Sequence, residues 1–157
     1  MKEFIDSTIF MGMHNKDETI RIACKNFFVK RIKKKIYMSL EQVGKCDDII
    51  WKFDRRTQDA YYPFMDNLHT IMNIKRVSYN EKDIKHSMSI KEDKLSFSEK
   101  LTLGMTIARK GRLITLKKSL LNLRNKNIIY LKIDEKELSF PEELEKLYQE
   151  SLKIRIN

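Results

Sequence analysis

The sequence is poor in cysteine, glycine and proline, and it has no long apolar run. Its two cysteines are too few for a disulfide framework and lie in apolar helical patterns typical of buried, reduced thiols. Four glycines and two prolines leave no linker and no glycine-rich phosphate loop. Neither a membrane span nor the basic start of a signal peptide is visible. We therefore expect a single domain over residues 1–157, located in the cytoplasm and not bound to a membrane.

Positive charge is what the sequence has in excess. Its 32 Lys and Arg residues against 22 Asp and Glu residues give a net charge of +10. A basic balance favours anionic partners such as nucleic acid. The basic residues are spread along the chain, however, and the one dense cluster, residues 30–35, is also typical of the solvated end of a helix. Charge alone is therefore compatible both with an RNA partner and with a general composition bias.

Apolar spacing predicts strands that alternate with helices. Strands are expected at residues 2–6, 35–38, 74–79, 112–115 and 127–133. Helices are expected after Asp17, from Leu40, over 58–72 with a break or kink near Tyr62 before Pro63, over 99–110, over 118–124 and over 141–152. This alternation favours an α/β fold with a central parallel sheet flanked by helices.

Three acidic residues occupy positions that can converge in such a sheet. Asp6 follows the first strand, Glu41 lies in the first turn after the second strand, and Glu99 begins the helix before the strand at 112–115. Ligands of parallel sheets bind beyond the carboxyl ends of the strands. Clustered carboxylates repel one another unless a cation lies between them, and Mg²⁺ or Mn²⁺ is the usual cation. The pattern therefore predicts a Mg²⁺ or Mn²⁺ site at Asp6, Glu41 and Glu99.

The segments around these acids resemble the PIN-like nuclease family. Residues 4–8, Phe-Ile-Asp-Ser-Thr, are similar to the family's first strand, which ends in Asp with a hydroxyl residue soon after. Residues 95–101 resemble its third acidic motif, and residues 108–117 are similar to the run that ends in Thr-x-Asp. The resemblance covers about residues 2–133 and leaves 134–157 as a C-terminal helical extension.

The resemblance implies a PIN-like fold and a metal-dependent endoribonuclease. In that activity Asp6, Glu41 and Glu99 hold Mg²⁺ or Mn²⁺, and Thr8 and Thr115 lie beside them. Many toxins of the family pair with an antitoxin, and PIN-like proteins often dimerise. The expected partners are therefore RNA, an antitoxin-like protein and a second copy of the chain.

The sequence departs from the family pattern at three positions. Glu99 stands where members usually have Asp, and Glu41 lies nearer to its strand than the second acid usually does, which leaves Asp47 as an alternative. Most importantly, Lys117 replaces the carboxylate of the Thr-x-Asp run. This lysine either displaces a metal, leaving a site that binds without cleaving, or contacts the phosphate while a single ion remains. Two functions stay open: a ribonuclease, or an inactive module that binds RNA or a protein.

Asp66 and His69 form a second polar pair. Residues three apart share a helical face, and such a pair suits metal binding or acid–base catalysis. A helix cap or a hydrogen-bonded histidine near the surface is the commoner role, and we favour it. The aromatic residues Trp51, Tyr61 and Tyr62 have the chemistry to stack on unpaired bases, but we expect them in the core or in an interface.

Overall fold

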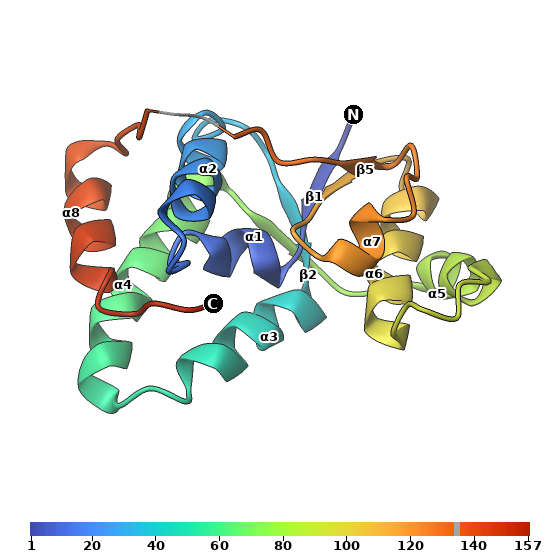
Figure 1. The fold of residues 1–157 in the computed structure, drawn as a ribbon, viewed down its shortest axis with the longest axis horizontal. Helices are drawn as coiled ribbons and strands as arrows, with labels where there is room; N and C mark the ends of the chain where they lie inside the picture. The colour runs from blue at the N-terminus through green and yellow to red at the C-terminus, as the bar shows by residue number, and fades with distance from the viewer. Residues whose placement is uncertain (134–135) are drawn as a thin grey trace.

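The computed structural model describes residues 1–133 and 136–157, which form strands alternating with helices (Figure 1). In chain order the elements are β1 (Glu3–Ile5), α1 (Ser7–Gly12), α2 (Glu18–Val29), β2 (Tyr37–Ser39), α3 (Leu40–Ile50), α4 (Arg55–Met72), β3 (Lys75–Val77), α5 (Glu81–Ser89), α6 (Phe97–Ala108), β4 (Arg112–Ile114), α7 (Lys118–Leu121), β5 (Ile128–Ile129) and α8 (Glu142–Ser151).

The five strands form one parallel sheet in the order β3-β2-β1-β4-β5. β1 is central, and its Phe4 pairs with Tyr37 of β2 on one side and with Leu113 of β4 on the other. The structure therefore confirms the predicted α/β class with a central parallel sheet flanked by helices, and it is consistent with a PIN-like fold. Because all strands run the same way, their carboxyl ends lie at one edge.

Alternate residues of the strands pack into two separate cores. Ile5 and Ile114 join a larger cluster with residues of α1, α2, α4 and α8, whereas Phe4 and Leu113 join a smaller cluster with α6 and α7. Successive side chains of a strand point to opposite faces of its sheet, which explains this division. Figure 1 shows the two groups of helices on either side of the central strands. Both faces are thus covered, as is usual for a parallel sheet.

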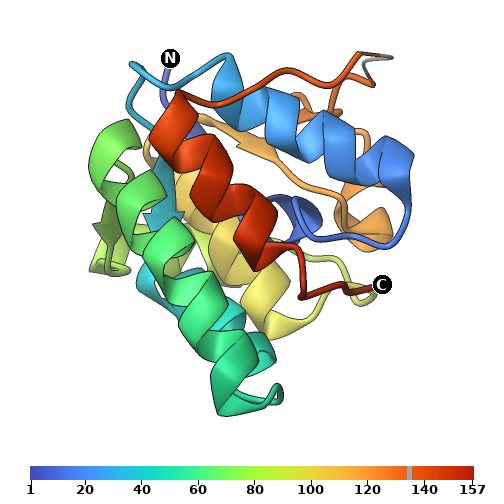
Figure 2. The same ribbon diagram turned by 90° about the vertical axis from the view of Figure 1, so that its left-hand side faces the viewer.

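Buried charges tie the C-terminal part of the chain to α2. Lys25 is 1% exposed, and its Nζ lies 2.7 Å from Oε2 of Glu137 and 2.9 Å from Oε1 of Glu145. Arg21 donates a hydrogen bond of 2.8 Å to the Tyr148 hydroxyl. Figure 2 shows α8 lying along α4. The expected C-terminal helix is therefore part of the larger core, although residues 134–135 of the predicted extension lie outside the described residues.

Helix α4 continues through Pro63, so the break expected near Tyr62 does not occur. A proline inside a helix leaves the carbonyl of the residue four positions earlier without its N–H partner. That residue is Asp59, and both Asp59 and Pro63 are exposed, so water satisfies the carbonyl. On the opposite face, Phe64 and Leu68 are fully buried in the larger core. The stabilisation from this burial holds the helix together where local propensity disfavours it.

Further differences concern polar segments and one aromatic residue. α5 is absent from the expected elements, because it carries few apolar residues; a capping box between Asn80 and Asp83 begins it, and Arg109 of α6 lies 2.6 Å from the buried Asp83 carboxylate. β5 is shorter than the expected strand at 127–133. Tyr61 is buried as expected, but Trp51 is 73% exposed, which contradicts a core position. None of the described helices is long and apolar enough to cross a membrane.

Gly104 allows α5 and α6 to approach each other closely. A Cβ atom at Gly104 would lie 2.6 Å from the backbone nitrogen of Ser87 and 2.7 Å from its Cα. We expect Gly104→Ala to force the helices apart and to lower the free energy of unfolding by about 1–3 kcal/mol, measured by urea denaturation. Gly44→Ala is the matched control in α3, since a Cβ there meets nothing within 4 Å. It should raise the free energy of unfolding by about 0.5–1 kcal/mol. Equal effects in both variants would contradict this view of the helix contact.

Candidate functional site

Three segments meet at the carboxyl ends of neighbouring strands. Asp6 follows β1, Glu41 lies in the first turn of α3 directly after β2, and Thr115 follows β4. The strand order β2-β1-β4 brings these segments side by side. The first turn of α6 reaches the same edge, because the Ser98 hydroxyl donates to Glu41. We call this region, made by Asp6, Glu41, Glu99 and the side chains bonded to them, the acidic edge.

The Asp6 carboxylate is 1% exposed and serves as the N-cap of α1. Its Oδ1 accepts hydrogen bonds from the Thr8 hydroxyl and, at 3.0 Å, from the Thr8 backbone N–H. Its Oδ2 accepts from the Thr115 hydroxyl. Both carboxylate oxygens are therefore engaged by the chain itself. Thr8 and Thr115 lie beside Asp6, as the sequence predicts.

Backbone amides orient the two threonine hydroxyls. The N–H of Leu116 donates to Thr8 Oγ1 at 2.9 Å, and the N–H of Lys117 donates to Thr115 Oγ1 at 3.0 Å. Each hydroxyl accepts from the backbone and so has its single proton available for Asp6. Burial raises the pKa of Asp6, while the hydrogen bonds from Thr115 and Thr8 and the charge of Lys117 oppose that rise.

Glu41 has a different set of partners. Its Oε1 accepts hydrogen bonds from the Tyr79 hydroxyl at 2.8 Å and from the Ser98 hydroxyl at 2.9 Å. Lys45, one turn along α3, donates to Ser98 Oγ at 2.6 Å. Burial, reinforced by the bond to Glu41, raises the pKa of Tyr79 to about 12, so this hydroxyl stays protonated as a donor at neutral pH.

Glu99 is held by hydroxyls and by Lys117. The Ser119 hydroxyl donates to Glu99 Oε2. Burial tends to raise the pKa of Glu99, but the hydrogen bonds from Ser119 and Ser96 and the positive charge of Lys117 outweigh it and lower the pKa. The same lysine charge favours ionised Asp6. Lys117 therefore supplies positive charge to two acids at the position where the PIN-like pattern has a carboxylate.

The predicted acids reach one edge of the sheet, but each is bonded to different neighbours. Across residues 1–133 and 136–157, no three His, Cys, Asp or Glu side chains lie close enough together to hold a metal ion. The acidic edge is instead a series of carboxylates that accept hydrogens from hydroxyl groups and are flanked by Lys45 and Lys117. As it stands, this arrangement stabilises negative charge without a cation.

Gln42 belongs to the acidic edge and was missed in the sequence. It is 1% exposed, its Oε1 accepts from the Ser7 N–H at 3.0 Å, and its Nε2 lies 3.4 Å from the Thr102 hydroxyl. It thereby links α3 to the start of α1 and to α6. The available signal was the Ser39-x-x-Gln42 spacing, which is the pattern of a helix capping box; Ser39 does cap α3 through the Gln42 N–H.

Asp47, the alternative second acid, faces α4. Burial raises its pKa, and the negative charge of Asp66 raises it further. Asp47 also acts on the pKa of Tyr62, another residue of α4. These neighbours place Asp47 between α3 and α4, one side chain removed from the residues that bond to Asp6.

Asp66 and His69 do not act as a pair. Asp66 is exposed, whereas His69 is 8% exposed and its ring centre lies 5.1 Å from that of Phe10. In the described structure no hydrogen bond or ion pair joins them, and Nδ1 of His69 has no hydrogen-bond partner. Burial, aided by the charge of Arg76, lowers the pKa of His69 to about 4. The expected surface position of this histidine is therefore wrong, and His69 is a neutral core residue at pH 7.

Comparison with known proteins assigns the chain to a family. A family model described as a family of unknown function, DUF6190, matches residues 1–157. The chain belongs to the DUF6190 family. No curated protein matches the sequence. The family description names no activity, so the acidic edge of this DUF6190 chain is the main guide to its function.

The pH dependence of stability tests the state of Asp6. Its folded-state pKa lies above the usual 3.8, so the folded protein holds this proton more tightly than the unfolded chain does. The resulting stability is present at low pH and is lost as the pH rises from 3.8 through the folded-state pKa. Asp6→Asn has no such proton. We expect its free energy of unfolding, relative to wild type, to increase across that range in urea denaturation.

A matched control for Asp6→Asn is Asp93→Asn, which removes an exposed carboxylate. It should leave the shape of the pH profile unchanged. Parallel profiles for wild type and Asp6→Asn would show that burial does not control the protonation of Asp6.

Proposed function

We propose that this DUF6190 chain is a non-catalytic PIN-like module that binds RNA through its basic surface. The observation that carries the proposal is the internal saturation of the acidic edge. Asp6 holds the hydroxyls of Thr8 and Thr115, Glu41 holds two hydroxyls, and Glu99 holds Ser119 next to Lys117. In this arrangement the acids connect structural elements rather than present oxygens to a ligand.

The residues of the acidic edge do not fit Mg²⁺ or Mn²⁺. These hard cations need accessible oxygen ligands, whereas Asp6 is buried and both of its oxygens accept hydroxyl hydrogens. Lys117 already offsets the charge of Asp6 and Glu99, and a divalent cation close to that ammonium group would be repelled. These contacts favour binding without cleavage over a metal-dependent ribonuclease.

Positive charge supports RNA as the partner. The net charge of +10 provides the long-range attraction that polyphosphate chains require. Lys33, Lys34 and Lys35 are all exposed in the turn after α2, so the dense cluster of the sequence is available to solvent. The two cysteines are buried free thiols, which fits a reducing compartment such as the cytoplasm.

Binding to a fluorescent single-stranded RNA, measured by anisotropy at increasing salt, tests this function. We expect affinity to fall steeply with salt, because each phosphate that a lysine neutralises releases counterions. The triple variant Lys33→Ala, Lys34→Ala, Lys35→Ala should lower the slope of log K against log salt by about 0.7 for each phosphate that these lysines neutralise. Lys153→Ala, an exposed lysine after α8, is the control and should leave the slope unchanged. Absence of binding at low salt would leave a protein, either an antitoxin-like partner or a second copy, as the occupant of this surface.

Comparison of wild type with Asp6→Asn separates binding from cleavage. We expect the two proteins to bind RNA equally and to leave it intact in the presence of Mn²⁺ or Mg²⁺, because Asp6 is buried and has no contact to offer. Electrophoresis of labelled RNA after incubation with either metal measures this. Cleavage by wild type that is abolished in Asp6→Asn would establish a ribonuclease instead.

A further inference from the structure

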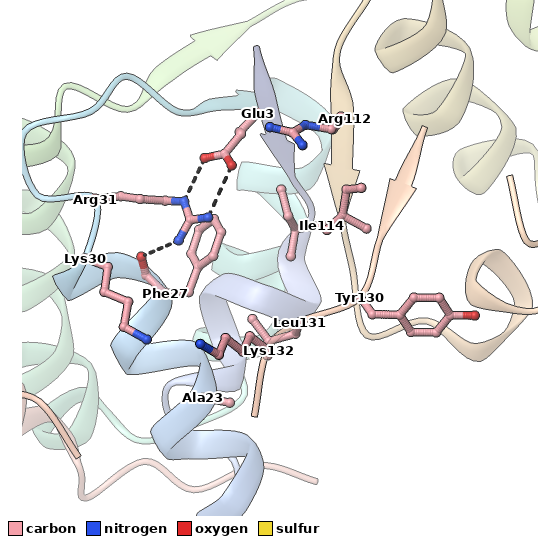
Figure 3. Close-up of a pocket in the computed structure, with 11 residues that line it drawn as sticks. Glu3, Ala23, Phe27, Lys30, Arg31, Arg112, Ile114, Tyr130, Leu131 and Lys132 are labelled. Atoms are coloured by element: carbon pink, nitrogen blue, oxygen red, sulfur yellow. Dashed lines mark hydrogen bonds and ion pairs between the residues drawn. The ribbon is translucent and has the colours of Figure 1, made fainter. Parts of the chain in front are cut away.

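A cavity of about 500 Å³ lies away from the acidic edge (Figure 3). Glu3 and Arg112, which line it, are the first residues of β1 and β4, whereas the acidic edge follows the last residues of the same strands. The C-terminal half of α2 and the segment 129–132 provide its other walls. Its volume lies within the range of small-molecule sites, roughly 300–1,000 Å³.

The lining of this cavity carries an excess of positive charge. Lys30, Arg31, Arg112 and Lys132 face a single acid, Glu3. Glu3 is occupied, because Nε of Arg31 lies 2.7 Å from its Oε2 and Nη2 lies 3.2 Å from its Oε1. In Figure 3, the side chains of Lys30 and Lys132 extend toward each other from opposite walls. Beyond the Arg31–Glu3 pair, the lining therefore has a net positive charge to which Arg112 and Lys132 contribute.

The rest of the lining is apolar and well ordered by packing. Ala23, Ile114 and Leu131 contribute aliphatic surface. The Arg31 guanidinium lies 4.0 Å from the centre of the Phe27 ring, which fixes its plane against that wall. Tyr130 turns its ring away, as Figure 3 shows, and its hydroxyl donates to the Leu121 carbonyl at 3.1 Å. The cavity thus combines an apolar wall with a cationic rim.

We propose that this cavity binds a phosphate monoester attached to a flat apolar group, which is the chemistry of a nucleotide. A phosphate monoester carries about 1.5 to 2 negative charges at pH 7, which suits the two cationic groups of Arg112 and Lys132 better than a single carboxylate does. The apolar wall takes the base, and Arg112 and Lys132 bind the phosphate. The source of this group is either a free mononucleotide or the 5′ end of an RNA; the second source rests on the proposed RNA-binding function, and the first does not.

Calorimetric titration with AMP, GMP, CMP and UMP, with adenosine and inorganic phosphate as comparisons, tests the first source. We expect a mononucleotide to bind at least tenfold more tightly than adenosine. Arg112→Ala and Lys132→Ala should each weaken nucleotide binding by roughly tenfold, since each removes a hydrogen bond between charged groups. Leu131→Ala should weaken binding of the nucleotide but not of inorganic phosphate. Lys153→Ala, which removes a lysine from outside the cavity lining, should have no effect.

Titration with one RNA that carries either a 5′-phosphate or a 5′-hydroxyl tests the second source. Tighter binding of the phosphorylated RNA, abolished in Arg112→Ala with Lys132→Ala, supports the RNA end as ligand. Mononucleotide binding without any RNA binding supports the cavity and contradicts the proposed RNA function. The inference is overturned if neither mononucleotides nor the 5′-phosphate bind, or if the double variant binds them as wild type does.

Discussion

The buried Asp6 carboxylate holds together segments that are far apart in the sequence. It caps α1 at the end of the central strand β1, and it bonds to Thr115 at the end of β4. The amides of Leu116 and Lys117 orient the two hydroxyls that bond to it, so the turn after β4 is bound to the start of α1 by a chain of directional contacts. With strands of only two or three residues, the ladder hydrogen bonds alone are few. The contacts of Asp6 therefore add substantially to what joins β1 to β4.

Most of the architecture was predictable because it depends on local patterns. Runs of apolar residues marked the strands, and Asp17 and Ser39 marked helix starts. The contacts of Asp6 with Thr8 and Thr115 also followed, since parallel strands bring their carboxyl ends together. The sequence predicted less well wherever distant residues decide the structure. Pro63 is tolerated because Phe64 and neighbouring residues are buried, and α5 depends on Asp83 meeting Arg109. Spacing along the chain carries no information on either contact.

The two ends of the sheet differ in electrostatic character. At the carboxyl ends, acids are satisfied by hydroxyls and Lys117, and the charges largely compensate one another. At the amino ends of β1 and β4, one acid is paired with Arg31, and the cavity lining there is cationic overall. Sequence reasoning looked for chemistry only where ligands of parallel sheets usually bind. It therefore identified Asp6 and Lys117 but missed Gln42, whose role is to link helices, and Arg112, whose neighbours come from α2 and the segment after β5.

The orientation of the threonine hydroxyls also limits how this site can change by single mutations. Replacing Lys117 by Asp would restore the PIN-like pattern at that position, yet the backbone amides would still direct both hydroxyls at Asp6. The new carboxylate would lie next to Asp6 and Glu99 with no cation to separate them, and mutual repulsion would destabilise the fold. A return to metal binding thus requires several coordinated substitutions. The present arrangement is self-preserving, because every first step away from it costs stability before any gain in activity.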